Sequence, residues 1–329
     1  MPKDYFAYVD NFKKYKDIES KMVLGNAGRG NCKFTIAIPT FKRPKLLEKS
    51  LQSAVNQKNI DDYEIIIIDN DPSGVLTQEI VKKHLKDNVY YFKNEKNIGM
   101  FGNWNRCIEL AKGEYITILN DDDWLSDDYL IECVNYLDDD IDGLYFRNNI
   151  IDLRGNKNKS KAKYEIIKKV LNFFSKEKKR LSLFDFFLGN QSAGTLGVLM
   201  KTDYLKKLGG YNPKYFPSSD YVLHANYCYN FNVYFINKKL NYYRILANES
   251  AKQETLRKWE VIDYNIRKYL IRNINMNKQI LDFLNELIQE NRIQGMVDQW
   301  GYRTNLKSQY RFIKRVYNKI IAVKYYLNL

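Results

Sequence analysis

The chain has 329 residues, of which 45% are hydrophobic and 28% are charged, and it contains only six prolines. These values exclude a collagen-like, disordered or multi-span membrane protein, and the length suits one large domain or two modest ones. No run of about 18 uncharged apolar residues occurs. The first ten residues lack the apolar core of a secretory signal, so we expect a cytoplasmic protein.

The cysteines and histidines are too few and too scattered for a metal or disulfide framework. Cys32, Cys107, Cys133 and Cys228 form no CxxC pair, and the chain has only two histidines. A zinc ribbon needs closely spaced ligands, and a disulfide scaffold needs an oxidising compartment. We therefore expect reduced, structural thiols.

The formal net charge of +14 is concentrated in two segments. Residues 154–180 hold eleven Lys and Arg against two acids, and residues 301–329 hold seven and no acid. No RNP, helix-turn-helix or zinc-finger pattern accompanies them, so a nucleic-acid partner is not favoured. Anionic lipid headgroups or a phosphorylated substrate suit these segments better, and a solvated face is the alternative.

After a polar extension over residues 1–32, apolar runs alternate with helical patterns. The glycines of residues 25–31 fit neither the Walker nor the dinucleotide spacing, so this stretch is interpreted as a mobile linker. Strands are then predicted at 34–38, 64–68, 89–92, 115–119 and 143–146. The intervening helices carry apolar residues at helical spacing within 46–55, 76–85, 100–111 and 130–137. Thr40 and Ser126 are the expected caps of the first and fourth of these helices.

Strands that are apolar on both faces and alternate with helices indicate a parallel sheet covered on both sides, so the predicted class is α/β. Mixed elements follow as far as residue 243. Residues 155–163 are too polar to be buried and form a candidate flap. From Glu254 the composition changes to long amphipathic helices.

The chemistry is expected where the predicted strands end, because ligands of such sheets bind outside the carboxyl ends of the strands. The loops 39–43, 69–71 and 120–123 should share one crevice. The last contains three consecutive aspartates, Asp121, Asp122 and Asp123, which repel one another unless a cation lies nearby. Oxygen ligands in a partly open site suit Mg²⁺ or Mn²⁺. An Asp-rich turn that caps the next helix is the alternative.

An ordered set of motifs resembles the family 2 glycosyltransferases with the GT-A fold, over about residues 33–250. The motifs are PTFKRP, IIIIDND, NIGMFGNWN, GEYITILNDDDWL, GGYNPKYFPSSDY and YYRILANES. The resemblance implies a GT-A-like, mainly parallel Rossmann-type sheet covered by helices, with a C-terminal helical extension. It divides the chain into an N-terminal extension (1–32), a catalytic domain (33–250) and a basic amphipathic helical tail (251–329). Within the catalytic domain, 33–125 would be the nucleotide-binding half and 126–250 the acceptor half.

The same resemblance implies roles around the donor. The residues expected to surround the nucleotide base are Pro39, Thr40, Phe41 and Arg43. Asp69 would accept a hydrogen bond from the uracil imide, Asp121 would contact the ribose, and Asp122 would bind the metal that bridges the diphosphate. The chain departs from the common pattern at Asn120, where many members carry the first aspartate.

Three further residues match the N-x-G...N stretch of the family, namely Asn97, Gly99 and Asn105. A contact with the donor sugar and plain helix packing are both open for Gly99 and Asn105. Arg244 lies in a segment that resembles the loop closing over the donor phosphates, where it would neutralise phosphate charge or form a salt bridge. The histidine that is frequent in that loop is replaced by Leu246.

Asp220, in the motif Ser218-Ser219-Asp220, occupies the place of the family's catalytic carboxylate and is the expected general base. Capping of the helix 221–230 is the structural alternative, and the two roles are compatible. The family often carries a glutamate directly before this aspartate. Here that position is Ser219, so the base lacks its usual acidic neighbour.

The expected function is therefore that of an inverting, divalent-metal-dependent glycosyltransferase in bacterial surface-glycan synthesis. Its donor would be a nucleotide diphosphate sugar, expected to be UDP-linked, and its acceptor a glycan or a lipid-linked saccharide. The basic segment 301–329 could bring it to the inner face of the cell membrane. A nucleotidyltransferase-like enzyme, and a non-catalytic membrane or nucleic-acid binding protein on a degenerate transferase core, are the alternatives. The oligomeric state stays open.

Overall fold

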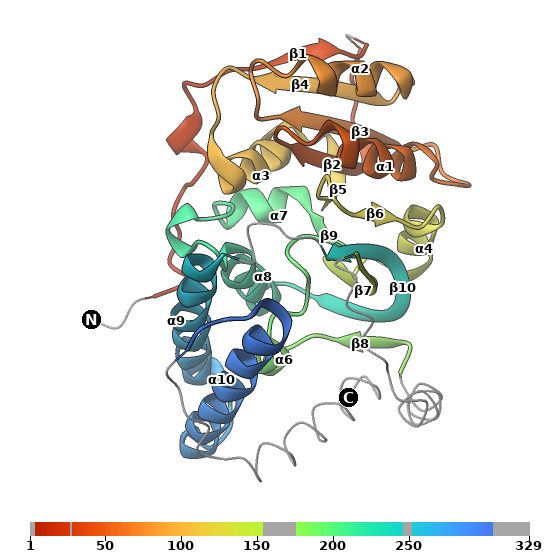
Figure 1. The fold of residues 1–329 in the computed structure, drawn as a ribbon. Helices are drawn as coiled ribbons and strands as arrows, with labels where there is room; N and C mark the ends of the chain where they lie inside the picture. The colour runs from red at the N-terminus through yellow and green to blue at the C-terminus, as the bar shows by residue number, and fades with distance from the viewer. Residues whose placement is uncertain (1–3, 27, 154–175, 246–251, 305–329) are drawn as a thin grey trace.

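A computed structural model describes residues 4–26, 28–153, 176–245 and 252–304 (Figure 1). Its strands are β1 (Ser20–Leu24), β2 (Cys32–Thr40), β3 (Tyr63–Asp69), β4 (Val89–Asn94), β5 (Gly113–Ile118), β6 (Trp124–Leu125), β7 (Gly143–Asp152), β8 (Lys178–Arg180), β9 (Val198–Lys201) and β10 (Val233–Ile245). Its α-helices are α1 (Pro44–Val55), α2 (Val75–Lys83), α3 (Gly99–Leu110), α4 (Tyr129–Tyr136), α6 (Leu183–Leu188), α7 (Thr202–Lys207), α8 (Ser219–Asn230), α9 (Gln253–Leu270) and α10 (Lys278–Trp300). Short 3₁₀ turns cover Lys13–Tyr15, Pro213–Tyr215 and Ile271–Asn273.

All the strands belong to one sheet with the order β1-β4-β3-β2-β5-β9-β7-β10-β6, and β8 pairs with β10. The predicted α/β class is confirmed. The four neighbours β4, β3, β2 and β5 are parallel, as the alternation of strands and helices predicts. The second half is more mixed, because the short strand β9 runs antiparallel to both β5 and β7 while β7 and β10 are parallel.

The sheet is buried on both faces, which explains why its strands read as continuous apolar runs. In β3, Ile65 and Ile67 point into the core that α1 covers, while Ile66 and Ile68 point into the core shared with α3 and α8. All four side chains are fully buried. The loops at the carboxyl ends of the parallel strands are thereby held on a rigid base.

The N-terminal extension is more ordered than the sequence pattern predicts. Residues 20–24 form β1, which pairs antiparallel with β4 and closes that edge of the sheet. Arg29, inside the expected linker, makes a forked ion pair with the buried Glu64, with Nε to Oε2 at 2.7 Å and Nη2 to Oε1 at 2.8 Å. The glycine-rich composition concealed this anchor, because ion pairing across the fold leaves no local sequence signal.

Two expected helix caps are wrong, although both helices exist. Thr40 is the last residue of β2, and α1 begins at Pro44 after Arg43. Ser126 lies before the N-cap of α4, which is Asp128. Strand β2 continues two residues beyond the predicted strand, which places Thr40 at its carboxyl end. The turn before α4 is two residues longer than expected, because the helix is capped at Asp128.

The C-terminal helices pack on the body of the protein and on each other. Figure 1 shows α9 and α10 side by side, below α8 and far from α1 and α2. Ile266 and Leu270 of α9, with Leu281 and Ile288 of α10, belong to the same core as α3 and α8. At least as far as residue 304, the expected tail is therefore part of the folded unit.

Several predictions lie outside the described residues, namely the flap 155–163, the loop beyond residue 245 and most of the basic segment 301–329. In the ranges that the structure does describe, none of the helices has the length and apolarity needed to cross a bilayer.

Candidate active site

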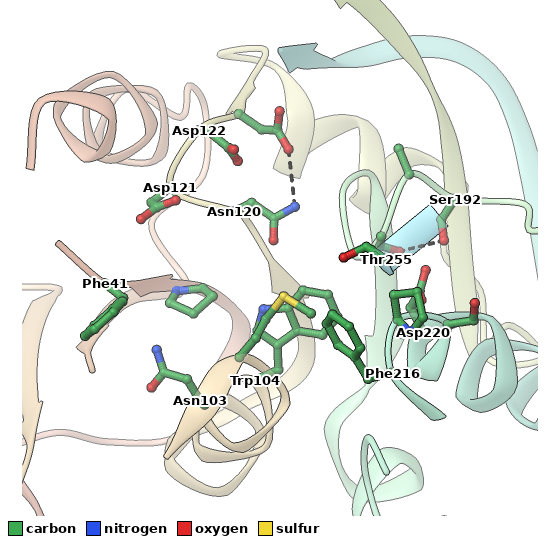
Figure 2. Close-up of a pocket in the computed structure, with 18 of the residues that line it drawn as sticks. Phe41, Asn103, Trp104, Asn120, Asp121, Asp122, Ser192, Phe216, Asp220 and Thr255 are labelled. Carbon is green, nitrogen blue, oxygen red and sulfur yellow. Dashed lines mark hydrogen bonds between the residues drawn. The ribbon is translucent and has the colours of Figure 1, made fainter. Parts of the chain in front are cut away.

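A cavity of about 890 Å³ opens at the carboxyl ends of the central strands. Figure 2 shows Asp121 and Asp122 on one side of it, Asp220 on the other, and Trp104 and Phe216 between them. The cavity brings together nine residues singled out from the sequence, namely Pro39, Thr40, Phe41, Arg43, Asn97, Gly99, Asp121, Asp122 and Asp220.

Strand pairing explains why residues 81 positions apart meet here. β2 is paired with β5, so the loops that follow them leave the sheet side by side. Thr40, at the end of β2, donates its hydroxyl to Asp121 Oδ2 at 2.8 Å. Both side chains are buried, which fixes the first aspartate of the triplet against the sheet. In the parallel register Ala37 is paired with Ile118, so Thr40 and Asp121, each three residues further along, come to the same level.

The three aspartates occupy three different environments. Asp121 is buried, and burial raises its pKa to about 6, opposed by the neighbouring Arg43 and by the Thr40 hydroxyl and reinforced by Asp122. Asp123 is also buried and points inward, where it accepts the backbone N–H of Arg244 at 2.9 Å and the amide of Asn120 at 3.2 Å. Burial, followed by the charge of Asp122, raises its pKa as well. Asp122 is the most exposed of the three at 13%.

Arg43 pairs with the two outer carboxylates of this cluster. Arg43 Nη1 lies 3.0 Å from Asp122 Oδ2 and 3.4 Å from Asp121 Oδ1. The Arg43 side chain is 46% exposed, so it can move away when a ligand enters. The acidic end of the cavity is thus compensated by a side chain that is not locked in place.

The opposite end of the cavity contains a separate carboxylate. Asp220 lies in the first turn of α8 and accepts a hydrogen bond from Asn190 Nδ2 at 2.7 Å. Burial raises its pKa to about 6, and the Asn190 bond and the N–H groups at the start of α8 oppose that rise. A carboxylate with this pKa is mostly ionised at neutral pH yet more basic than a surface aspartate, as a general base requires.

Three of the predicted site residues do not line the cavity. Asp69 is fully buried, where it accepts the hydroxyl of Tyr91 at 2.8 Å and the backbone N–H of Asp71 at 2.9 Å. Asn105 holds the backbone of Tyr211, donating to its carbonyl at 2.8 Å and accepting its N–H at 2.7 Å. Their donor contacts stay predictions.

Arg244 is the third of these residues. Its guanidinium carbon lies 5.1 Å from the ring centre of Trp124, and its side chain is only 7% exposed. Its backbone N–H donates to Asp123 of the acidic cluster, and its guanidinium charge acts on the same carboxylate. A contact with the donor phosphates also stays a prediction, because the loop that follows lies outside the described residues.

The sequence reasoning missed several lining residues: Asn190, Ser192, Ala193 and Gly194 in the loop after α6, and two further groups. Asn103 and Trp104 lie within the NIGMFGNWN motif, so their position could have singled them out. The second group comes from the C-terminal helices and consists of Thr255, Trp259, Asp263 and Arg292. Nothing in their local sequence distinguishes them from other residues of amphipathic helices, and only packing against α8 brings them to the cavity.

Comparisons with known proteins agree with this geometry. The family described as Glycosyl transferase family 2 matches residues 35–195. A Campylobacter jejuni protein named GalNAc(5)-diNAcBac-PP-undecaprenol beta-1,3-glucosyltransferase is 30% identical over 222 residues, which are 67% of each chain. An uncharacterized glycosyltransferase of Methanocaldococcus jannaschii is 29% identical over 193 residues, 57% of this chain and 61% of its own length.

The fold is also found in solved structures. Staphylococcus aureus TarS 1-349, crystallised with UDP-GlcNAc, superimposes with a TM-score of 0.57 at 16% identity, covering 90% of this chain and 81% of that one. At this identity the likeness concerns the fold alone, and it places the chain in the GT-A class of transferase folds.

With the matching motifs and the relatives, the assignment becomes more specific. The chain belongs to family 2 of the glycosyltransferases. It spans 61% of the length of the archaeal relative and 67% of the Campylobacter relative.

Proposed function

We propose that the protein transfers a sugar from a nucleotide diphosphate donor to an acceptor hydroxyl, with inversion at the anomeric carbon. The observation that carries this proposal is the presence of two carboxylate sites in one cavity. Asp121 and Asp122 lie at one end, beside Arg43, and Asp220 lies at the other. The end with Asp121, Asp122 and Arg43 suits a leaving diphosphate accompanied by a cation. The end with Asp220 suits removal of a proton from the acceptor.

The donor would occupy the end of the cavity formed by β2, β5 and α3. Phe41 is 38% exposed and offers a ring to the nucleotide base. Asp121 can accept a hydrogen bond from a ribose hydroxyl, and Arg43 can turn from Asp122 to the diphosphate. The proposed preference for uridine rests on the family resemblance at Asp69. TarS was crystallised with UDP and UDP-GlcNAc, but it shares only the fold with this chain and therefore does not carry the proposal.

A divalent cation fits this end of the cavity if the protein carboxylates and the donor phosphates both coordinate it. No group of three or more Asp, Glu, His or Cys side chains gathers to hold a metal in the described ranges. Mg²⁺ and Mn²⁺, however, commonly take one or two protein carboxylates and complete their shell with phosphates and water. Asp122 is the residue that would hold such an ion, with Asp121 behind it. When bound, the cation would stabilise the negative charge of the leaving diphosphate.

At the other end of the cavity, Asp220 would take the proton from the acceptor hydroxyl. As that oxygen forms its bond to the anomeric carbon, the bond from this carbon to the diphosphate oxygen breaks on the opposite face. The nucleoside diphosphate leaves with the bonding electrons, and the proton ends on Asp220. Asn190 donates to one oxygen of Asp220 and so orients the carboxylate within the cavity.

The acceptor is proposed to be a glycan or a lipid-linked saccharide of a bacterial surface polysaccharide. Trp104, Phe216 and Trp259 present aromatic surfaces to the cavity, which suit the apolar faces of sugar rings. The Campylobacter relative is named for an undecaprenol-linked acceptor, and a Bacillus spizizenii relative for poly(ribitol-phosphate). Such acceptors would place the protein at the inner face of the cell membrane, with the basic segment 301–329 as the proposed contact.

A thermal-shift panel of nucleotide sugars, with and without Mn²⁺, tests the donor. A ligand that binds only the native state raises its stability in proportion to its affinity. We expect UDP-sugars to raise the melting temperature more in the presence of Mn²⁺, and the Asp122→Ala variant to lose that increment. A panel without any nucleotide-dependent shift would contradict the proposal.

The products distinguish this function from its alternatives. A glycosyltransferase releases a nucleoside diphosphate, whereas a nucleotidyltransferase releases pyrophosphate. Salt-sensitive binding of oligonucleotides or anionic vesicles, without any binding of UDP, would instead favour a non-catalytic binding protein.

A further inference from the structure

The serine that begins helix α8 makes an unusual contact. Ser218 is the N-cap residue, but its hydroxyl does not cap the helix. It donates instead to Asp263 Oδ1 of α9 at 2.6 Å, and Asp263 Oδ2 accepts from Arg292 Nη2 of α10 at 2.5 Å. Ser218 and Asp263 are each 2% exposed, so the contact is fully enclosed. The chain of contacts ends two residues before Asp220.

The same residues form one wall of the cavity. Ser218, Asp220, Asp263 and Arg292 all line it, from three different helices. In Figure 2, Thr255 of α9 also lies on the Asp220 side of the cavity. The segment that continues past the family resemblance therefore supplies a second acidic side chain to the wall that carries Asp220, through its contact with Ser218.

We propose that Asp263 is a positioning residue for Asp220: paired with Arg292 and bonded to Ser218, it fixes the first turn of α8 and keeps a negative charge beside the proposed base. This inference rests on the proposed function, because it assumes that Asp220 takes the proton of the acceptor. It makes α9 and α10 part of the catalytic site rather than an appended tail.

Electrostatics determines the direction in which Asp263 shifts the pKa of Asp220. A like charge near a carboxylate favours the protonated form, and a nearby cation favours the ionised form. Asp263 therefore raises the pKa of Asp220. Its effect on this pKa is smaller than that of burial, which also raises it, and that of the Asn190 bond, which lowers it. Arg292 neutralises part of that charge. The basicity of Asp220 therefore depends on how far the charge of Arg292 compensates that of Asp263.

Other titratable groups surround Asp220 without replacing Asp263. They are Tyr221 and His224 on α8, Tyr211 on the segment after α7, Tyr145 on β7 and Arg267 on α9. Burial raises the pKa of the tyrosines and lowers that of His224 to about 3, so these groups are neutral at the pH of the reaction. Arg267 bonds to Asn285 Oδ1 at 2.6 Å.

Two substitutions with opposite expected shifts test the proposal. Asp263→Asn keeps an acceptor for Ser218 but removes the negative charge, so the acidic limb of the kcat/KM profile should move down by about half a pH unit or more. Arg292→Gln removes the compensating charge, so the same limb should move up. A loss of packing alone would not produce shifts of opposite sign.

Matched controls lie on the outer surface of α10. Asp282→Asn and Lys278→Gln change the same charges at exposed positions outside the cavity, and both should leave the profile unchanged. If Asp263→Asn fails to fold, Arg292→Gln decides the question by itself: an upward shift supports the proposal, and its absence overturns it.

A readout without turnover separates this inference from the proposed function. The carboxyl carbon of Asp220 can be titrated by NMR in ¹³C-aspartate-labelled protein and assigned with Asp220→Asn. We expect the Asp220 midpoint to fall in Asp263→Asn and to rise in Arg292→Gln, even if no sugar is transferred. Unchanged midpoints in both variants, or shifts in the same direction, would overturn the positioning role of Asp263.

Discussion

Arg43 and Asp122 form an ion pair at the donor end of the cavity, with Nη1 3.0 Å from Oδ2. The carboxylate proposed to hold a divalent cation is thus already neutralised by a side chain from the first loop. Because Arg43 is half exposed, the pair is readily exchanged for another partner. If Asp122 holds the proposed cation, Arg43 would compete with it until the diphosphate of the donor gives Arg43 an anionic partner of its own.

Removing the arginine should strengthen metal binding to the protein without nucleotide. Arg43→Gln frees Asp122, so we expect tighter Mn²⁺ binding in calorimetric titration, together with a raised KM for the donor, since the phosphates lose a cation. Lys45→Gln, which removes an exposed positive charge two residues further along the chain, serves as the control. Unchanged or weaker Mn²⁺ binding would show that Arg43 does not compete with the metal.

Removing Asp122 should abolish metal-dependent transfer and leave the fold intact. Asp122→Ala deletes a carboxylate whose bond to Arg43 is exposed, so the circular dichroism spectrum and the melting temperature should stay close to those of the wild type. Transfer is measured as release of nucleoside diphosphate with Mn²⁺ present. Full activity of the wild-type protein in excess chelator would refute the role of the metal.

Replacing the proposed base should slow turnover without weakening donor binding. Asp220→Asn keeps the hydrogen bond to Asn190 possible but cannot take a proton, so kcat should fall about 100-fold or more. The Kd for UDP, measured by calorimetry, should stay within about twofold, because Asp220 lies at the other end of the cavity. Equal turnover of both proteins would remove Asp220 from the mechanism.

The same variant should be more stable than the wild type at high pH. The pKa of Asp220 is raised in the folded state to about 6 from 3.8, so its stabilising contribution is full below pH 3.8 and is lost as the pH rises through about 6. Asp220→Asn should therefore gain about 1 to 3 kcal/mol more at pH 8 than at pH 4. Urea unfolding at the two pH values measures the difference, and an equal gain at both would show that burial does not strain this carboxylate.

Asn105 should matter for stability rather than for the donor. Asn105→Ala leaves the buried N–H and carbonyl of Tyr211 without partners, which should cost about 2 to 4 kcal/mol in the free energy of unfolding. UDP binding by the folded protein should be unchanged. Asn97→Ala, at an exposed position that lines the cavity, is the contrasting variant. Loss of UDP affinity in Asn105→Ala at unchanged stability would place Asn105 in the donor site instead.

The sequence by itself determined the parallel half of the sheet and the donor end of the cavity. In β3, apolar residues on both faces indicate a buried strand, and the polar residues that follow each strand must gather where parallel strands end. This local logic brought Thr40, Asp121 and Asp122 to the correct edge. The motif order added Asp220, whose place at the start of α8 depends on a helix that the pattern also predicts.

Only the tertiary structure decided the other wall of the cavity and the environment of each carboxylate. Asp69 is the last residue of β3 as Thr40 is of β2, yet Tyr91 from the adjacent strand and the backbone N–H of Asp71 donate to its oxygens. Asp263 follows Asp220 by 43 residues and meets Ser218 only because α9 packs on α8. Hydrogen bonds between distant segments depend on packing in three dimensions, and periodicity and spacing along the chain carry no record of them.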